Sequence, residues 1–100
     1  MTYNDFVNDI TEMIIEVSGE EKATIYNSLD ELGMDSINCV EFVMNIEKKF
    51  DIGIPDESVD KIKGDYTFYR IMQLLSKNYP QLPSLRKERQ DKINKINKNK

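Results

Sequence analysis

The sequence predicts an all-α fold, a small four-helix bundle of three main helices and one short helix, with a long loop between the first two. Apolar residues recur at spacings of three and four where the main helices are expected, the period of a helix with one buried face. No stretch has the alternation of apolar and polar residues that is typical of a strand. Because 100 residues leave room for one small core, we expect a single helical domain over residues 1–80.

The first helix is expected to begin after Thr2 and to end at Gly19. Thr2 and Asp5 have the types and spacing of a short capping box, and Ser18-Gly19 is a helix stop. One stripe of large apolar side chains would face the core: Tyr3, Phe6, Val7, Ile10, Met13, Ile14 and Val17.

Residues 19–35 keep no helical period and contain Gly, Ser, Asn and Asp, so they predict a long loop. Three apolar residues would anchor this loop to the core: Ile25, Leu29 and Leu32. A connection of this length is unusual in a compact domain and is often functional.

The second helix is expected to run from Ser36 to Phe50, where Asp51, Gly53 and Pro55 end it. Residues placed at about 100° intervals separate into two apolar faces. The face expected in the core holds Cys39, Phe42, Val43, Ile46 and Phe50. Nearly opposite lie Ile37, Val40 and Met44, interleaved with Glu41, Glu47 and Lys48.

The second apolar face has two interpretations. A bundle helix needs only one buried face, so an apolar stripe rimmed by charge indicates a docking surface for a partner protein. Met44 suits this role because its thioether side chain adapts to several partners. Alternatively, the three side chains lie beneath the long loop or are scattered surface groups.

Two further helices are expected before residue 80. A short turn of helix after Pro55 would cover about Glu57 to Ile62, and the last core helix would begin near Thr67 and end before Tyr79-Pro80. The last helix would place five apolar residues in the core: Phe68, Ile71, Met72, Leu74 and Leu75.

The charge of the chain is asymmetric. Residues 1–79 carry a net charge of -9 and residues 80–100 carry +5, within a total of -4. An acidic domain repels nucleic acid and favours encounters with basic proteins. Residues 81–100 are expected to be a basic extension, either mobile or a short helix that docks on an acidic partner or on the domain itself.

Composition also argues against catalysis by this chain alone. It contains no histidine and one cysteine, so it lacks the commonest general base and offers neither an internal disulfide nor a cysteine-only zinc site. We expect no catalytic residue and no metal ligand. The chain has no apolar run long enough for a membrane span, and its amino terminus does not resemble a signal peptide, so we expect a cytoplasmic monomer with no membrane insertion.

The dipeptide Asp35-Ser36 stands at the expected start of the second helix. Aspartate and serine are both good helix N-caps, and Gly33 permits a tight turn before them. The hydroxyl of Ser36 could also hold a phosphate ester, because unpaired backbone N–H groups and the helix dipole favour negative charge there.

The stretches Leu32-Gly33-Met34-Asp35-Ser36-Ile37, Val40-Glu41-Phe42-Val43-Met44 and Phe50-Asp51-Ile52-Gly53-Ile54-Pro55-Asp56-Glu57 resemble the acyl carrier protein family. The resemblance is dense from about Leu29 to Ile62. It implies that Ser36 carries a 4'-phosphopantetheine, added from coenzyme A by a phosphopantetheinyl transferase, and that Asp35 helps to present it to the transferase and its metal. The protein would shuttle thioester-bound acyl groups among acyl-loading, acyl-transferring or condensing enzymes of fatty-acid, polyketide or related biosynthesis.

By position, the resemblance places the partner contacts at Ile37, Glu41, Met44 and Glu47, and the apolar face adds Val40. Asn38 and Lys48-Lys49 depart from the strongly acidic recognition helix of carriers for bulk fatty-acid synthesis, which leaves the pathway and the cargo open. Cys39 would be structural, since its core side would hide the thiol. The alternative function is an acidic helical interaction module without a prosthetic group, which would not need the hydroxyl of Ser36.

Overall fold

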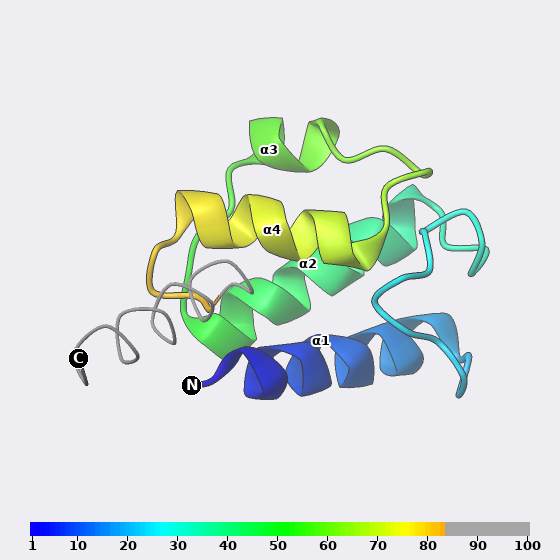
Figure 1. The fold of residues 1–100 in the computed structure, drawn as a ribbon. Coiled ribbons are helices and arrows are strands. Elements are labelled where there is room, and N and C mark those ends of the chain that lie inside the picture. The colour runs from blue at the N-terminus through cyan, green and yellow to red at the C-terminus, as the bar shows by residue number, and fades with distance from the viewer. Residues whose placement is uncertain (84–100) are drawn as a thin grey trace.

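The computed structural model describes residues 1–83, and the expectations for the basic extension fall mostly on residues 84–100, outside the described residues. Within these 83 residues four helices follow in order: α1 (Tyr3–Ser18), α2 (Ser36–Phe50), α3 (Asp56–Asp60) and α4 (Phe68–Asn78) (Figure 1). Within residues 1–83, pairing of the strand type is limited to an isolated bridge between Ser28 and Thr67. The predicted all-α bundle of three main helices and one short helix is therefore confirmed.

The ends of α1 are set by local signals that the sequence predicts. The Thr2 hydroxyl accepts a hydrogen bond from Asp5 N at 3.1 Å, and the Asp5 carboxylate accepts one from Thr2 N at 3.1 Å. This pair is the predicted capping box. At the other end Gly19 takes a φ of 75°, a left-handed conformation that costs glycine little, and its N–H bonds to Ile15 O at 2.8 Å.

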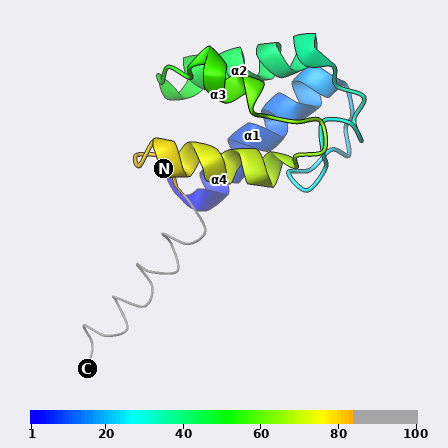
Figure 2. The ribbon, with the colours of Figure 1, turned by 90° about the horizontal axis from the view of Figure 1, so that it is seen from above.

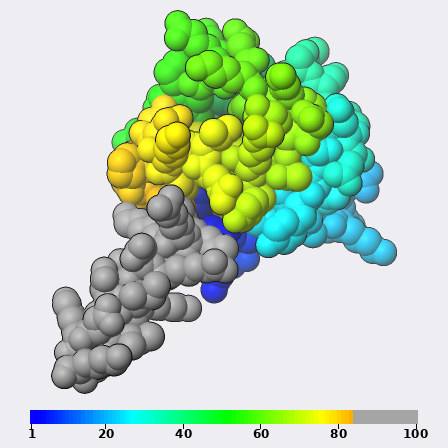
Figure 3. Space-filling model, turned by 45° about the horizontal axis from the view of Figure 1, so that its top comes forward, coloured from blue at the N-terminus to red at the C-terminus, as the bar shows by residue number. Residues whose placement is uncertain are grey.

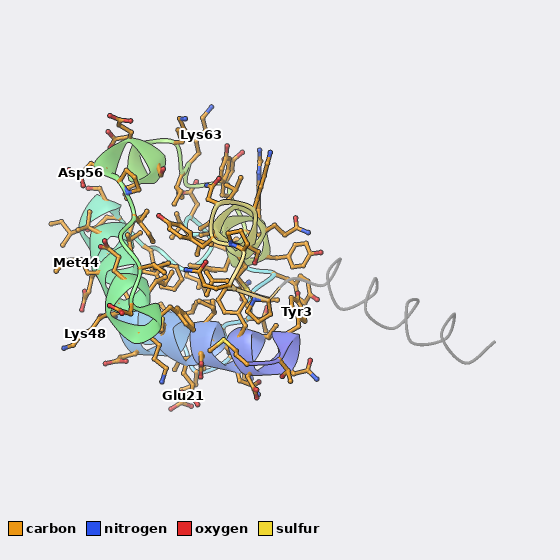
Figure 4. The ribbon with its side chains drawn as sticks, turned by 90° about the vertical axis from the view of Figure 1, so that its left-hand side faces the viewer. Tyr3, Glu21, Met44, Lys48, Asp56 and Lys63 are labelled. Carbon is orange, nitrogen blue, oxygen red and sulfur yellow. The ribbon has the colours of Figure 1, made fainter. Side chains whose placement is uncertain are left out.

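The core is built from the inner faces of α1, α2 and α4. Figure 4, a view turned by 90°, shows α1 beneath, α2 on one side, α4 on the other and α3 above them, and Figure 2 shows the same helices from above. Phe42 and Phe68 meet edge to face with ring centroids 5.2 Å apart, and Phe6 meets Phe50 in the same way at 5.3 Å. These aromatic pairs join the three main helices.

Most of the predicted core residues are buried, with differences at the edges. On α2, Phe42, Val43 and Ile46 are buried, whereas Cys39 and Phe50 are half-buried at the margin. The prediction for Leu74 is wrong, because its side chain is 40% exposed. The buried stripe of α4 is Phe68, Ile71, Met72 and Leu75, and Leu74 lies about 100° away from Leu75 around the helix. The buried set also includes Leu82, beyond the predicted domain end at residue 80.

The loop between α1 and α2 is fastened to the segment before α4 and to the first turn of α4. Asp30 N donates to Gly64 O at 2.9 Å, Phe68 N to Asn27 O at 3.1 Å, and Tyr69 N to Ile25 O at 2.7 Å. The predicted anchors behave accordingly: Ile25 and Leu29 are buried and Leu32 is half-buried. Figure 3 shows the loop in cyan against the segment that leads into α4.

The short helix α3 begins at Asp56 and ends at Asp60, so it starts one residue earlier and ends two residues earlier than predicted. Pro55 supplies the extended N-cap position, with φ -60° and ψ 145°. A helix of this length makes few internal hydrogen bonds, so its position depends on tertiary contacts, and Ser58 of α3 lines a cavity together with side chains of α2 and α4.

Candidate functional site

Ser36 is the first residue of α2, and its side chain is exposed. The N-cap is Asp35, whose carboxylate accepts from Asn38 N at 2.9 Å, while the Asn38 side-chain oxygen accepts from Asp35 N at 3.2 Å. Asp35 therefore makes the cap that sequence reasoning left open between Asp35 and Ser36. Within residues 1–83 the Ser36 hydroxyl has no hydrogen-bond partner, so it is available for chemistry.

The backbone around Ser36 suits an attached anion. Of the first N–H groups of α2, that of Asn38 is bonded to the Asp35 side chain and that of Cys39 to Asp35 O at 3.0 Å. The N–H groups of Ser36 and Ile37 have no such partner in the described part of the chain. Together with the helix dipole they favour negative charge on the Ser36 oxygen.

The turn that leads to Ser36 is tightly defined. Gly33 has a φ of 65°, as its predicted role in a tight turn requires, and Met34 N bonds to Leu29 O at 2.9 Å. Ser28 N donates to the Glu31 carboxylate at 3.0 Å, and Glu31 N donates to the buried Ser28 hydroxyl at 3.1 Å. This reciprocal pair resembles a helix capping box, and it holds the loop in the path that presents Ser36.

The Ser28–Glu31 pair predicts an acid-sensitive turn. Hydrogen bonds with the backbone and then the side chain of Ser28 lower the pKa of Glu31 from its ordinary value of 4.5. A pKa lowered by folding means that the contribution of Glu31 to stability is fully present above pH 4.5 and is lost as the pH falls through the lower folded-state pKa.

We expect the stability difference between the unsubstituted chain and Glu31→Gln to shrink as the pH falls from neutrality to well below 4.5. Urea unfolding of both proteins at several pH values measures this difference in the free energy of unfolding. Glu20→Gln, which changes an exposed glutamate outside this turn, is the control. A Glu31→Gln difference that does not change with pH would contradict this role.

A depression of about 410 Å³ lies beside Ser36 between the loop, the start of α2, the end of α3 and the segment after α3. Its lining includes three carboxylates, those of Asp30, Asp35 and Asp60, together with Met34, Val40 and Ile62. Ile62 also lines a second cavity of about 190 Å³ between α2, α3 and α4. The wall of this second cavity is mainly apolar and includes Val43, Ile46, Ile54, Ile71, Leu74 and Leu75. Ile62 thus contributes to the walls of both the depression beside Ser36 and the mainly apolar cavity.

Cys39 is half-buried and lines the depression beside Ser36. Burial raises the pKa of its thiol from 9.0, so the reactive thiolate form is disfavoured at neutral pH. This environment agrees with a structural role for Cys39.

The second apolar face of α2 is open to solvent. Ile37 is 75% exposed, Val40 48% and Met44 60%, so the loop does not cover them. Met44 and Lys48 are labelled on this outer side in Figure 4. Glu41 is exposed, whereas Glu47 is half-buried and its carboxylate accepts a hydrogen bond from Ile54 N at 3.0 Å. Glu47 therefore has a local backbone partner that the sequence did not reveal.

Three residues that depart from the acidic pattern have partners or favourable positions within the chain. Asn38 completes the capping box of Asp35. Lys48 and Lys49 lie in the last turn of α2, where the helix dipole favours cations, and they line a groove with Asp9, Glu12 and Glu16 of α1. Local stability therefore accounts for these residue types.

Within the described residues, no group of three or more His, Cys, Asp or Glu side chains is arranged to hold a metal ion. Across residues 1–83, no helix combines the length and the apolar character that crossing a membrane requires.

Comparisons with known proteins converge on this region. The family model for the phosphopantetheine attachment site matches residues 8–63, which include Ser36 and all of α2. An acyl carrier protein of Wolinella succinogenes is 42% identical in a 67-residue alignment that covers 62% of this chain and 88% of the relative. No solved structure matches the chain at a significant level.

Proposed function

Because the chain belongs to the acyl carrier protein family, with 4'-phosphopantetheine as its prosthetic group, we propose that Ser36 is the attachment residue. The observation that carries this proposal is the exposed Ser36 hydroxyl, without a partner in residues 1–83, on the first turn of a helix that Asp35 already caps. Acyl carrier proteins are carriers rather than catalysts, and we propose the same for this chain.

The chemistry supplied by the prosthetic group is a thiol that holds an acyl cargo as a thioester. The chain's own residues position that group. The N–H groups of Ser36 and Ile37 lie where a phosphodiester on the Ser36 oxygen would be stabilised. The cap uses Oδ1 of Asp35, which leaves Oδ2 for the metal of a phosphopantetheinyl transferase.

We further propose that the cavity between α2, α3 and α4 shields the cargo from water. Its apolar wall offers an acyl chain an environment that favours burial, and Ile62 lies between this cavity and the depression beside Ser36. The cargo would belong to fatty-acid, polyketide or related biosynthesis. Asn38 and Lys48-Lys49 do not discriminate between these pathways, since each has an explanation within the chain. We place the protein in the cytoplasm as a monomer.

Partner enzymes, namely the transferase and the acyl-loading, acyl-transferring or condensing enzymes, would dock on the open face of α2. The contacts would come from Ile37, Val40, Glu41, Met44 and Glu47. The exposed apolar side chains supply area that is buried on docking, and Glu41 supplies charge complementary to a basic partner.

Replacing Met44 by Asp is expected to lower the kcat/KM of modification by the transferase about tenfold, the effect of losing about 1.4 kcal/mol of docking energy. The melting temperature should hardly change, because Met44 is 60% exposed. Tyr26→Asp changes a side chain of similar exposure, 69%, in the loop and serves as the control. A large fall in the melting temperature of Met44→Asp, or equal kinetic losses in both variants, would argue against docking at this face.

Loading with an acyl group tests the proposed function. The folded chain is incubated with magnesium, a broad-specificity phosphopantetheinyl transferase and octanoyl-coenzyme A. We expect its mass to rise by one octanoyl-phosphopantetheine, and neutral hydroxylamine to remove only the octanoyl group, because a thioester is cleaved and a phosphodiester is not. No mass gain in folded protein would contradict the carrier function and favour an interaction module.

A further inference from the structure

The segment between α2 and α3, residues 51–55, forms a strap that two side chains hold from different helices. The Glu47 carboxylate of α2 accepts a hydrogen bond from Ile54 N at 3.0 Å. The hydroxyl of Tyr79, the C-cap of α4, donates to Gly53 O. These two bonds hold consecutive residues of the strap, so they tie the end of α2 to the end of α4.

The strap lies at the opposite end of α2 from Ser36. Ser36 begins the helix and Glu47 lies near its end, and a helix of 15 residues is about 22 Å long. Figure 1 shows the strap at the left, beside the last turn of α4, while the start of α2 lies at the right. An acyl chain that enters the cavity from the Ser36 side would therefore reach the strap last.

The strap also forms part of the wall of the apolar cavity. Ile54 of the strap and Tyr79 both line this cavity, together with Asn78 from the same end of α4. The cavity measures about 190 Å³, which is below the roughly 300 Å³ at which pockets for larger ligands begin. While the strap is held in place, the cavity has room for a short acyl chain only.

We infer that Glu47 and Tyr79 are specificity-determining residues that set the length of acyl chain the cavity accepts. This inference rests on the proposed carrier function. A short acyl chain fits in the cavity while both hydrogen bonds of the strap persist. A longer acyl chain must displace Ile54, which breaks the hydrogen bond from Ile54 N to Glu47 and the hydrogen bond from Tyr79 to Gly53 O.

The inference gives Glu47 a role distinct from docking. Its carboxylate acts on the strap through the Ile54 N–H, on the inner side of the connection to α3. Glu41, six residues earlier on α2, is exposed, and within residues 1–83 its side chain makes no hydrogen bond with the strap. A substitution at Glu41 is therefore expected to affect docking and not the strap.

The test uses the full chain and the variants Tyr79→Phe, which removes the hydroxyl donor, and Glu47→Met, which removes the carboxylate acceptor at similar side-chain length. The matched controls are Tyr26→Phe and Glu20→Met, which change an exposed tyrosine and an exposed glutamate outside the strap and outside the docking face. Each protein is loaded from butyryl-, octanoyl-, dodecanoyl- or hexadecanoyl-coenzyme A, and intact mass confirms loading. The hydrolysis half-life of each thioester is then measured.

In the unsubstituted chain and the controls, we expect the short chains to be protected and the dodecanoyl and hexadecanoyl thioesters to hydrolyse faster. In Tyr79→Phe and Glu47→Met, the half-life of the dodecanoyl thioester should rise by about 2- to 12-fold relative to the controls, the ratio that corresponds to one ordinary hydrogen bond. Hydrogen exchange of the strap amides in the unloaded variants should also be faster than in the controls.

Three outcomes separate the hypotheses. Normal loading with the same dependence on chain length in all five proteins overturns the strap inference and leaves the carrier function standing. Unchanged hydrogen exchange in the strap of both variants overturns it as well, because the two bonds then do not hold the segment. Failure of every protein to load overturns the carrier function and the inference with it.

Discussion

Ser36→Ala protein is expected to gain no phosphopantetheine while unfolding at nearly the same temperature as the unsubstituted chain. The loss should be complete, because alanine has no oxygen to form the phosphodiester. Stability should change by no more than about 0.5 kcal/mol, the usual range for a surface substitution. The reason is that Asp35 makes the N-cap of α2 and the Ser36 hydroxyl has no partner in the described chain.

The experiment compares intact masses after incubation with coenzyme A, magnesium and the transferase, and thermal unfolding curves of the same samples. Ser58→Ala, in α3, is the matched control and should be modified normally. Modification of Ser36→Ala would place the attachment at another residue. An unmodified but strongly destabilised Ser36→Ala would show that the side chain has a structural role, and the loss of modification would then not identify the site.

Replacing Phe42 by Ala is expected to have the largest effect on stability, a loss of about 3–5 kcal/mol. Phe42 is 1% exposed, and its ring meets that of Phe68 at 5.2 Å, so the substitution leaves a cavity between α2 and α4 and removes an aromatic pair. Small domains have total stabilities of about 5–15 kcal/mol, so the variant would be close to unfolding at 37 °C.

Urea unfolding measures this loss, and Phe42→Leu, which retains much of the volume, should cost far less. Modification of Phe42→Ala should fall in parallel with its folded fraction, because the presentation of Ser36 depends on α2. A loss of less than about 1 kcal/mol would mean that the contact between α2 and α4 contributes little to the bundle.

Much of the fold follows from local signals in the sequence. Thr2 and Asp5 form the predicted capping box, Gly19 ends α1 in a left-handed conformation, and α2 has the predicted bounds Ser36–Phe50. These features depend on residues within one or two turns of each other, so type and spacing suffice to predict them. The exposed stripe on α2 was also predictable, since helical periodicity places Ile37 and Met44 opposite Phe42.

Features that depend on distant partners were not predictable. Tyr79 bonds to Gly53 O across 26 positions, and nothing local marks either residue for that contact. Gly64 lies so close to Asp30 that an added Cβ would come within 2.2 Å of Asp30 Oδ1. Leu74 was misplaced because the apolar pattern of α4 does not tell which residues face α3 rather than the core. Asn38 is instructive, because its spacing from Asp35 was a local signal of a capping box that was overlooked.

The central claim is that this chain carries its prosthetic group on Ser36. The most direct measurement digests the modified, unsubstituted chain with a protease and locates the added mass by fragmentation of the peptides. We predict a single phosphopantetheine on the peptide that contains Asp35-Ser36-Ile37, with fragment ions that assign it to Ser36. Location of the added mass at any other residue, or the absence of added mass on every peptide of a folded sample, would contradict the account.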